Sequence, residues 1–86
     1  MLNFPNQSRF FDSTRRAVRF WGHDSAMEWS FFVSEDALKS IKPDMQRDEA
    51  AFLNAFDANR TLIYAAATKA YKRDRKGSYE LVVADF

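Results

Sequence analysis

The chain has 86 residues, of which 47% are hydrophobic, so it can build one core but not two, and we expect a single folded domain over residues 1–86. Its formal net charge of +1 creates no overall field to attract nucleic acid or a membrane. The absence of cysteine excludes disulfides and thiolate metal sites.

The N-terminal residues show no targeting signal. Residues 1–7 lack the basic start and the apolar run of a signal peptide. No segment approaches the roughly 20 apolar residues that a membrane span needs. We therefore expect a cytoplasmic protein without a membrane partner.

Three short strands are predicted in the first part of the chain, because apolar and polar residues alternate there with a period of two. They cover residues 8–12, 17–21 and 27–33, and residues 12–15 and 22–25 supply turn chemistry between them. Turns of this length make consecutive strands antiparallel neighbours.

The same alternation separates two faces of the sheet. The face expected to hold the helices carries Val18, Phe20, Met27, Trp29, Phe31 and Val33. Arg19, Trp21 and Phe32 point to the other face. Aromatic side chains are therefore predicted on a face that no helix covers.

Two helices are predicted after the strands. Ser34 is a good N-cap for a short helix that ends at Ile41. Residues 45–76 contain neither Gly nor Pro and predict one long helix, with Asp44 as N-cap, Gly77 as a left-handed C-terminal residue and a bend at residues 57–59. Its apolar stripe at helical spacing consists of Met45, Phe52, Leu53, Phe56, Ile63, Ala67, Ala70 and Tyr71.

The last segment, residues 78–86, alternates weakly around Leu81 and is predicted to return to the sheet as its fourth strand. The expected fold class is α+β. Its architecture is an antiparallel four-stranded sheet in the order β-β-β-α-α-β, with a short and a long helix on one face.

Three motifs in the chain are not demanded by any generic strand or helix. They are Ala17-Val18-Arg19-Phe20-Trp21-Gly22 followed by Asp24, Phe31-Phe32-Val33, and Phe56-Asp57-Ala58-Asn59-Arg60 with Ile63, Ala67 and Tyr71 downstream. In these motifs the chain resembles the small bacterial family called domain of unknown function 1488, over nearly its whole length. The resemblance implies a compact α+β fold of bacterial origin. It implies no activity, so no catalytic role passes to Arg60, Trp21 or Tyr71.

Arg60 is the one charged residue beside the apolar stripe of the long helix, between Phe56 and Ile63. A buried guanidinium needs a partner, because an unpaired buried charge costs several kcal/mol. In one interpretation its stem lies along the sheet and its head meets a carboxylate or carbonyl groups. In the other, Arg60 contacts an anion or a ligand.

Catalytic and metal-binding patterns are missing from the sequence. His23 is the only histidine, and although Asp24 follows it, adjacent residues in a turn point apart and no motif places a nucleophile. One histidine without cysteine leaves only carboxylates as metal ligands, and two glycines leave no Gly-rich phosphate loop. We expect no enzyme, no cofactor and no metal.

Nucleic-acid binding is the alternative hypothesis. Five basic residues, Lys69, Lys72, Arg73, Arg75 and Lys76, lie near the end of the long helix, and Arg15, Arg16 and Arg19 form a second group near Trp21. Aromatic rings on a sheet face can stack bases. Basic residues at a helix C-terminus also have a dipole reason to be there.

Protein interaction is the favoured hypothesis. An open sheet face with aromatic residues is a surface that monomers rarely leave exposed. The candidate interaction surface consists of Arg19, Trp21, Phe32 and Arg60, and Ala51, Ala58 and Ala65 near Leu62 offer close helix approach. We expect a homodimer or a module that docks on a protein partner.

Overall fold

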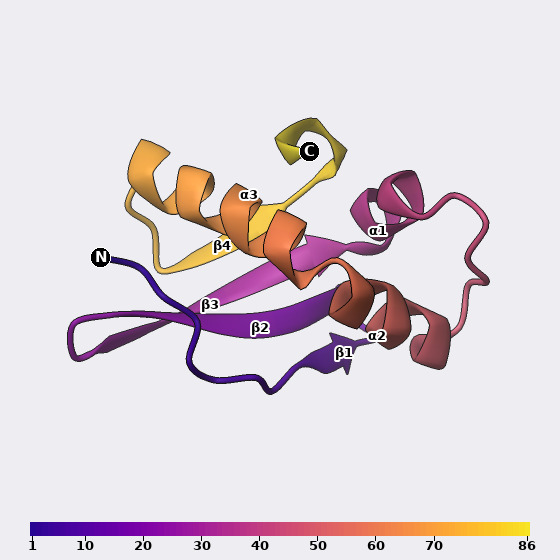
Figure 1. The fold of residues 1–86 in the computed structure, drawn as a ribbon, viewed down its shortest axis with the longest axis horizontal. Coiled ribbons are helices and arrows are strands. Elements are labelled where there is room, and N and C mark those ends of the chain that lie inside the picture. The colour runs from indigo at the N-terminus through magenta and orange to yellow at the C-terminus, as the bar shows by residue number, and fades with distance from the viewer.

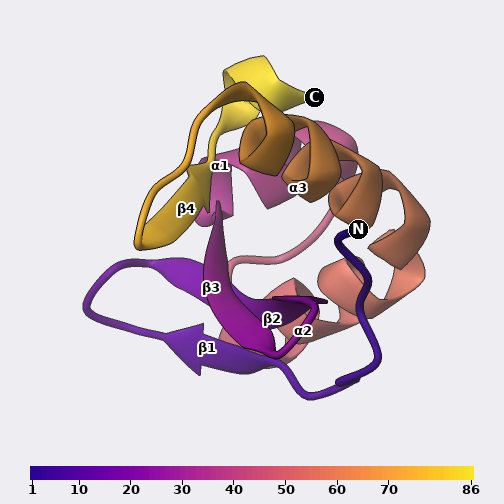
Figure 2. The same cartoon turned by 90° about the vertical axis from the view of Figure 1, so that its left-hand side faces the viewer.

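The computed structural model describes residues 1–86 and shows an α+β fold (Figure 1). Four strands, Phe10–Asp12 (β1), Ala17–Asp24 (β2), Met27–Ser34 (β3) and Ser78–Leu81 (β4), form one sheet in the order β1-β2-β3-β4. The helices are Glu35–Ile41 (α1), Glu49–Ala58 (α2) and Arg60–Arg73 (α3), and a short 3-10 turn covers Val83–Asp85 (η1). Figure 2 shows α2 and α3 together on one side of the sheet. The predicted class, strand number and one-sided helix layer are confirmed.

Strand β2 is longer than the sequence predicted. Gly22 pairs with Trp29 and Asp24 with Met27, so the ladder with β3 continues through residues that were expected to form a turn. The turn lies at the next two residues, where Ser25 takes a left-handed conformation with φ of 56°. The prediction of a turn at residues 22–25 was wrong because Gly22 serves packing in a strand rather than a turn.

The prediction of a purely antiparallel sheet was also wrong. Strand β4 pairs with β3 in parallel, with Phe31 opposite Tyr79 and Val33 opposite Leu81. The helices between the two strands carry the chain back to the end of the sheet where β3 starts (Figure 1). A strand that begins there must run in the same direction as β3, as in any helical crossover connection.

The predicted long helix is two helices with a break at Asn59. A straight helix over residues 45–76 would be about 45 Å long, whereas the longest dimension of the whole molecule is 36 Å. Asn59 leaves the helical conformation with φ of −126°, and its side-chain amide donates a hydrogen bond to the Ala55 carbonyl at 2.8 Å. The break falls within the bend predicted at residues 57–59.

Both expected ends of the long helix were wrong. Helix α2 starts at Glu49, and the N-cap is Asp48, whose carboxylate accepts a hydrogen bond from the Ala51 amide at 2.8 Å. The chain before it stays irregular because the Met45 side chain is buried in the core. Helix α3 ends at Arg73, and Gly77 has no left-handed conformation. The following turn is instead tied by the Lys76 amide, which donates to the Tyr79 hydroxyl.

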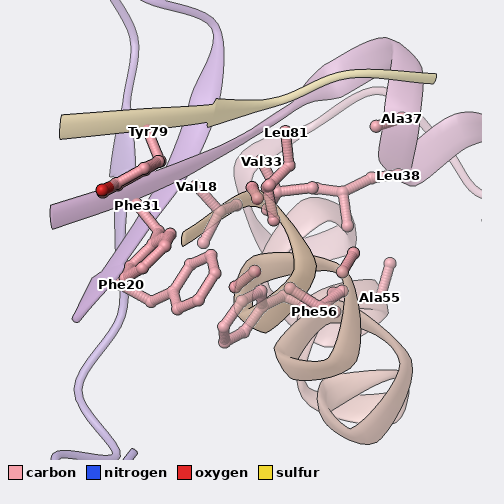
Figure 3. Packing of buried hydrophobic residues seen from close by; sticks show 14 of the residues in the cluster. Val18, Phe20, Phe31, Val33, Ala37, Leu38, Ala55, Phe56, Tyr79 and Leu81 are labelled. Carbon is pink, nitrogen blue, oxygen red and sulfur yellow. The ribbon is translucent and has the colours of Figure 1, made fainter. Parts of the chain in front are cut away.

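The core forms between the sheet and the helices, and Figure 3 shows side chains of β2, β3 and β4 meeting those of α1 and α2. The predicted stripe is buried except for Leu53, which is half-buried against the core. Phe20 packs on Phe31 and Phe56, with ring centroids 5.4 and 5.1 Å away. Every helix is too short or too polar to span a bilayer.

Gly22 is the point where the N-terminal segment joins the core. Asn3 forms backbone hydrogen bonds of 2.8 Å in both directions with His23, which places Leu2 and Phe4 over Gly22. A Cβ atom at Gly22 would lie 2.9 Å from both Leu2 Cδ1 and Phe31 Cε1. The glycine therefore leaves the space that the N-terminal segment fills.

The substitution Gly22→Ala should lower the free energy of unfolding by about 1–3 kcal/mol, because the added methyl group overpacks this contact. Urea denaturation measures the loss. Gly77→Ala is the matched control, since nothing lies within 4 Å of its Cβ position and it has no left-handed backbone. Equal effects of the two substitutions would contradict this account of Gly22.

Candidate interaction face of the sheet

The face of the sheet opposite the helices, which we call the open face, has Arg19 at its centre. Arg19 lies in β2 between Phe10 of β1 and Phe32 of β3, which are its partners in the two ladders. Trp21 follows two residues later on the same face of β2. The sheet thus brings together three of the four residues of the predicted interaction surface: Arg19, Trp21 and Phe32.

Two arginines cover the aromatic rings of the open face. The Arg19 guanidinium carbon lies 5.1 Å from the Trp21 ring and 5.6 Å from the Phe32 ring. From the other side, the Arg15 guanidinium lies 4.2 Å from the Phe32 ring. Phe32 is therefore only 5% exposed, although no helix covers it. Phe10, which no arginine covers, is 60% exposed.

The margins of the open face carry paired charges. On the β4 side, Arg15 donates to Glu80 at 3.0 Å. On the side of the β2–β3 turn, His23 Nε2 lies 2.8 Å from a Glu28 carboxylate oxygen. Both carboxylates of these pairs are thus engaged at the edges, away from Arg19.

A shallow hollow lies on the open face beside Phe32, between the start of β2 and the end of β4. Its lining residues are Arg15, Ala17, Phe32, Ser34, Glu80, Leu81 and Val82. The hollow thus combines apolar lining with the Arg15–Glu80 ion pair.

Arg60, the fourth residue of the predicted surface, lies apart from the open face. Its Nη2 donates to Asp57 at 2.8 Å and to the Gln7 carbonyl at 2.9 Å, and its Nη1 donates to the Tyr64 hydroxyl at 2.6 Å. Its guanidinium also lies 4.9 Å from the Phe56 ring. This geometry matches the interpretation in which Arg60 meets a carboxylate and a carbonyl group, and it ties the N-terminal segment to the break between α2 and α3.

The Asp57 carboxylate also accepts hydrogen bonds from a second arginine, Arg9. Arg9 makes a two-pronged contact with its carboxylate, with Nε to Oδ1 at 3.0 Å and Nη2 to Oδ2 at 2.9 Å. The hydrogen bond from Arg9, and after it the one from Arg60, lowers the pKa of Asp57 from its ordinary value. The cluster is thus an ion-pair network that holds residues 7–9 on the helices.

The basic residues near the end of α3 lie on the helix side of the molecule, not on the open face. Arg73 pairs with Asp85 at 3.4 Å, Arg75 with Asp24 at 3.9 Å, and Lys76 with Asp74 at 3.8 Å. Lys69 and Lys72 form no ion pair and are exposed. The five residues proposed for nucleic-acid contact are therefore partly neutralised, and they are separated from the Arg15 and Arg19 group.

His23 and Asp24 point to opposite sides of β2, since they are neighbours in a strand. Asp24 instead accepts hydrogen bonds from the N-terminal amino group at 2.8 Å and from the Tyr71 hydroxyl at 2.6 Å. These two bonds, the amino group first, lower the pKa of Asp24, and the bond to Asp24 raises the pKa of Tyr71. No cluster of three or more His, Asp or Glu side chains could hold a metal ion.

Comparison with known proteins identifies the family. The family described as protein of unknown function (DUF1488) matches residues 2–83. The chain belongs to the DUF1488 family. The resemblance read from the sequence motifs is thereby confirmed.

A solved structure supports the fold. A crystal structure of a DUF1488 protein of unknown function from Shewanella loihica PV-4 is similar to this chain, with a TM-score of 0.82 and 18% sequence identity, over 93% of this chain and 90% of that one. At this identity the likeness establishes a shared fold. No curated protein matched the chain.

Sequence reasoning missed Phe10 as part of the open face. The sequence contains no signal for it, because Phe10 and Phe11 are equally apolar and only the register with β2 decides which one faces the core. Phe11 stacks on Phe52 at 5.4 Å between ring centroids, and Phe10 is left outside.

The Asp57 network should make stability depend on pH. Because the pKa of Asp57 is lower in the folded chain than in the unfolded one, where it is about 4, the network stabilises the fold above that pH. The contribution is lost as the pH falls through the folded-state value. Asp57→Asn should cost about 1 kcal/mol of unfolding free energy at neutral pH, given its partial exposure.

Urea denaturation of both proteins between neutral pH and pH 3 tests this expectation. The difference between their free energies of unfolding should become smaller on acidification, because protonation of Asp57 removes from the parent chain the charge that Asp57→Asn lacks. A difference that stays constant over this range would show that the carboxylate charge of Asp57 contributes nothing to the fold.

Proposed function

We propose that this DUF1488 protein is an interaction module that docks on a protein surface, either a second copy of the chain or another protein, through the open face of its sheet. The observation that supports the proposal is the exposed Phe10 ring on that face. Phe10 is 60% exposed on the edge strand β1, on the same face as Trp21, while the other face is buried under helices. An exposed apolar group on an uncovered sheet face is typical of a binding surface. We keep the cytoplasmic location that the sequence suggests as part of the proposal.

The alternative, nucleic-acid binding, has less support from the geometry. Stacking of bases needs an accessible ring face, but two guanidinium groups enclose Phe32 and leave it 5% exposed. Glu28 and Glu80 on the margins of the open face would repel phosphates. The proposal therefore favours a protein partner over a nucleic acid.

Site-specific photo-crosslinking tests the proposal. The photoreactive residue p-benzoylphenylalanine, placed at Phe10 in the full chain and irradiated in the native cell, should give discrete crosslinked products. A product of twice the mass of the chain would identify a second copy, and other masses would identify a different protein. The bulky aromatic replacement suits Phe10 because that side chain is already largely in solvent.

Met27 is the matched control position. It lies in β3 on the side of the sheet opposite the open face and is 55% exposed, so the probe is comparably accessible there. We expect no matching product from this position. The same products from both positions, or none from Phe10, would overturn the proposal that the open face is the docking surface.

A further inference from the structure

Arg19 differs from every other arginine of the chain. Each of the others forms an ion pair with an aspartate or glutamate: Arg9, Arg15, Arg16, Arg47, Arg60, Arg73 and Arg75. Arg19 has no carboxylate partner, although it lies at the centre of the open face. Its positive charge is therefore uncompensated within the chain.

The hydrogen bonding of Arg19 is incomplete as well. Its Nη2 donates to the Ser30 hydroxyl at 2.8 Å, but its Nε is buried and has no partner. Its Nη1 makes no hydrogen bond within the chain and remains open to solvent. A guanidinium can donate five hydrogen bonds in a planar fork that matches a carboxylate. The neighbours of Arg19 satisfy only one of them.

No carboxylate of the chain is placed to form an ion pair with Arg19. Of the carboxylates on the margins of the open face, Glu80 is paired with Arg15, and Glu28 lies opposite His23 near the β2–β3 turn, away from Arg19. The Arg19 guanidinium carbon lies 5.1 Å from the Trp21 ring centroid and 5.6 Å from the Phe32 ring centroid, so both rings contact the charged group. An anion for Arg19 must therefore come from another molecule.

We propose that the open face binds an acidic segment of another protein, with an aspartate or glutamate side chain on Arg19 and apolar side chains against Phe10 and Trp21. The inference rests on the function proposed above and names the chemistry of the partner. One uncompensated arginine matches a single carboxylate rather than a chain of phosphates, which needs several basic groups in a row. Charge complementarity of this kind selects the partner and orients it.

A second copy of the chain is a poorer occupant. In a symmetric dimer, the same patch of both subunits meets across the twofold axis. Because Arg19 lies at the centre of the patch, it would meet the same arginine of the second copy. Two like charges facing each other in a buried interface are unfavourable.

Titration of the isotope-labelled full chain with a model peptide, followed by NMR, tests the inference. The probe is a short acetylated and amidated peptide of alternating glutamate and leucine, and the reporter is the indole N–H signal of Trp21. The Trp29 indole is buried on the helix-facing side of the sheet and serves as the internal reference. We expect the Trp21 signal to shift and the Trp29 signal to stay. The same peptide with glutamine in place of glutamate should shift neither.

Substitutions separate binding from folding. Arg19→Met keeps an unbranched side chain and removes the charge, and it should weaken peptide binding about tenfold or more. Urea unfolding of the variant under the same conditions checks that it is folded. Lys69→Met removes the same charge on α3, where Lys69 is exposed and unpaired, and it should bind the peptide as the parent chain does.

Three results would overturn the inference: equal shifts with the glutamine peptide, unchanged binding by Arg19→Met, or a Trp21 shift with an oligothymidylate but not with the acidic peptide. A crosslinked product at Phe10 of twice the mass of the chain would also count against it, in favour of a second copy. The probe at Phe10 can also be placed in the Arg19→Met variant. If the parent chain and this variant give the same crosslinked products with other proteins, the docking function is supported and the acidic character of the partner is contradicted.

Discussion

The helices of this chain cover only one face of the sheet, so the side chains of the other face must be stabilised without a covering layer. The sheet has four strands, and α1, α2 and α3 contribute to the core on one face of it only. On the other face, arginine side chains stabilise Phe32, since two guanidinium groups lie over its ring and shield it from water. Long side chains thus replace part of the missing layer.

The arginines divide into two groups by what they contact. Arg9 and Arg60 converge on Asp57 and hold the N-terminal segment against the helices, so their charges are used inside the fold. Arg15 similarly ties the start of β2 to Glu80 in β4. Arg19 has the aromatic contacts but not the ion pair. Its charge is thus the one arginine charge that no carboxylate of the chain offsets.

Local patterns in the sequence predicted the strand and helix regions and most of their buried faces, but not the exact bounds of the elements. The alternation around Phe20 and Phe31 and the helical spacing of Phe56, Ile63 and Tyr71 identified the buried side chains, because periodicity reports directly on which face is covered. The break at Asn59 was also readable as a bend. These features depend on residues that are near one another in the chain.

Features that depend on distant residues were not readable. The parallel direction of β4 follows from where the helices end, and the exposure of Phe10 follows from its register with Arg19. The continuation of β2 through Gly22 depends on Leu2 and Phe4 packing over it. The position of Arg60 away from the open face likewise depends on Gln7 and Asp57. In each case the deciding contact lies in another segment.

The parallel pairing of β3 and β4 has a consequence for how the chain folds. The β2–β3 hairpin joins neighbouring residues across a tight turn, whereas Val33 pairs with Leu81 across a chain segment that contains all three helices. Contacts between distant residues carry a larger loop-closure entropy and slow folding. On the ribosome β4 emerges after the other three strands and the three helices, so the sheet is the last part of this core to be completed. Until β4 pairs, the backbone N–H and C=O groups along one edge of β3 have no strand partner. The pairing of β4 therefore completes the sheet and removes a site at which another chain could add a strand.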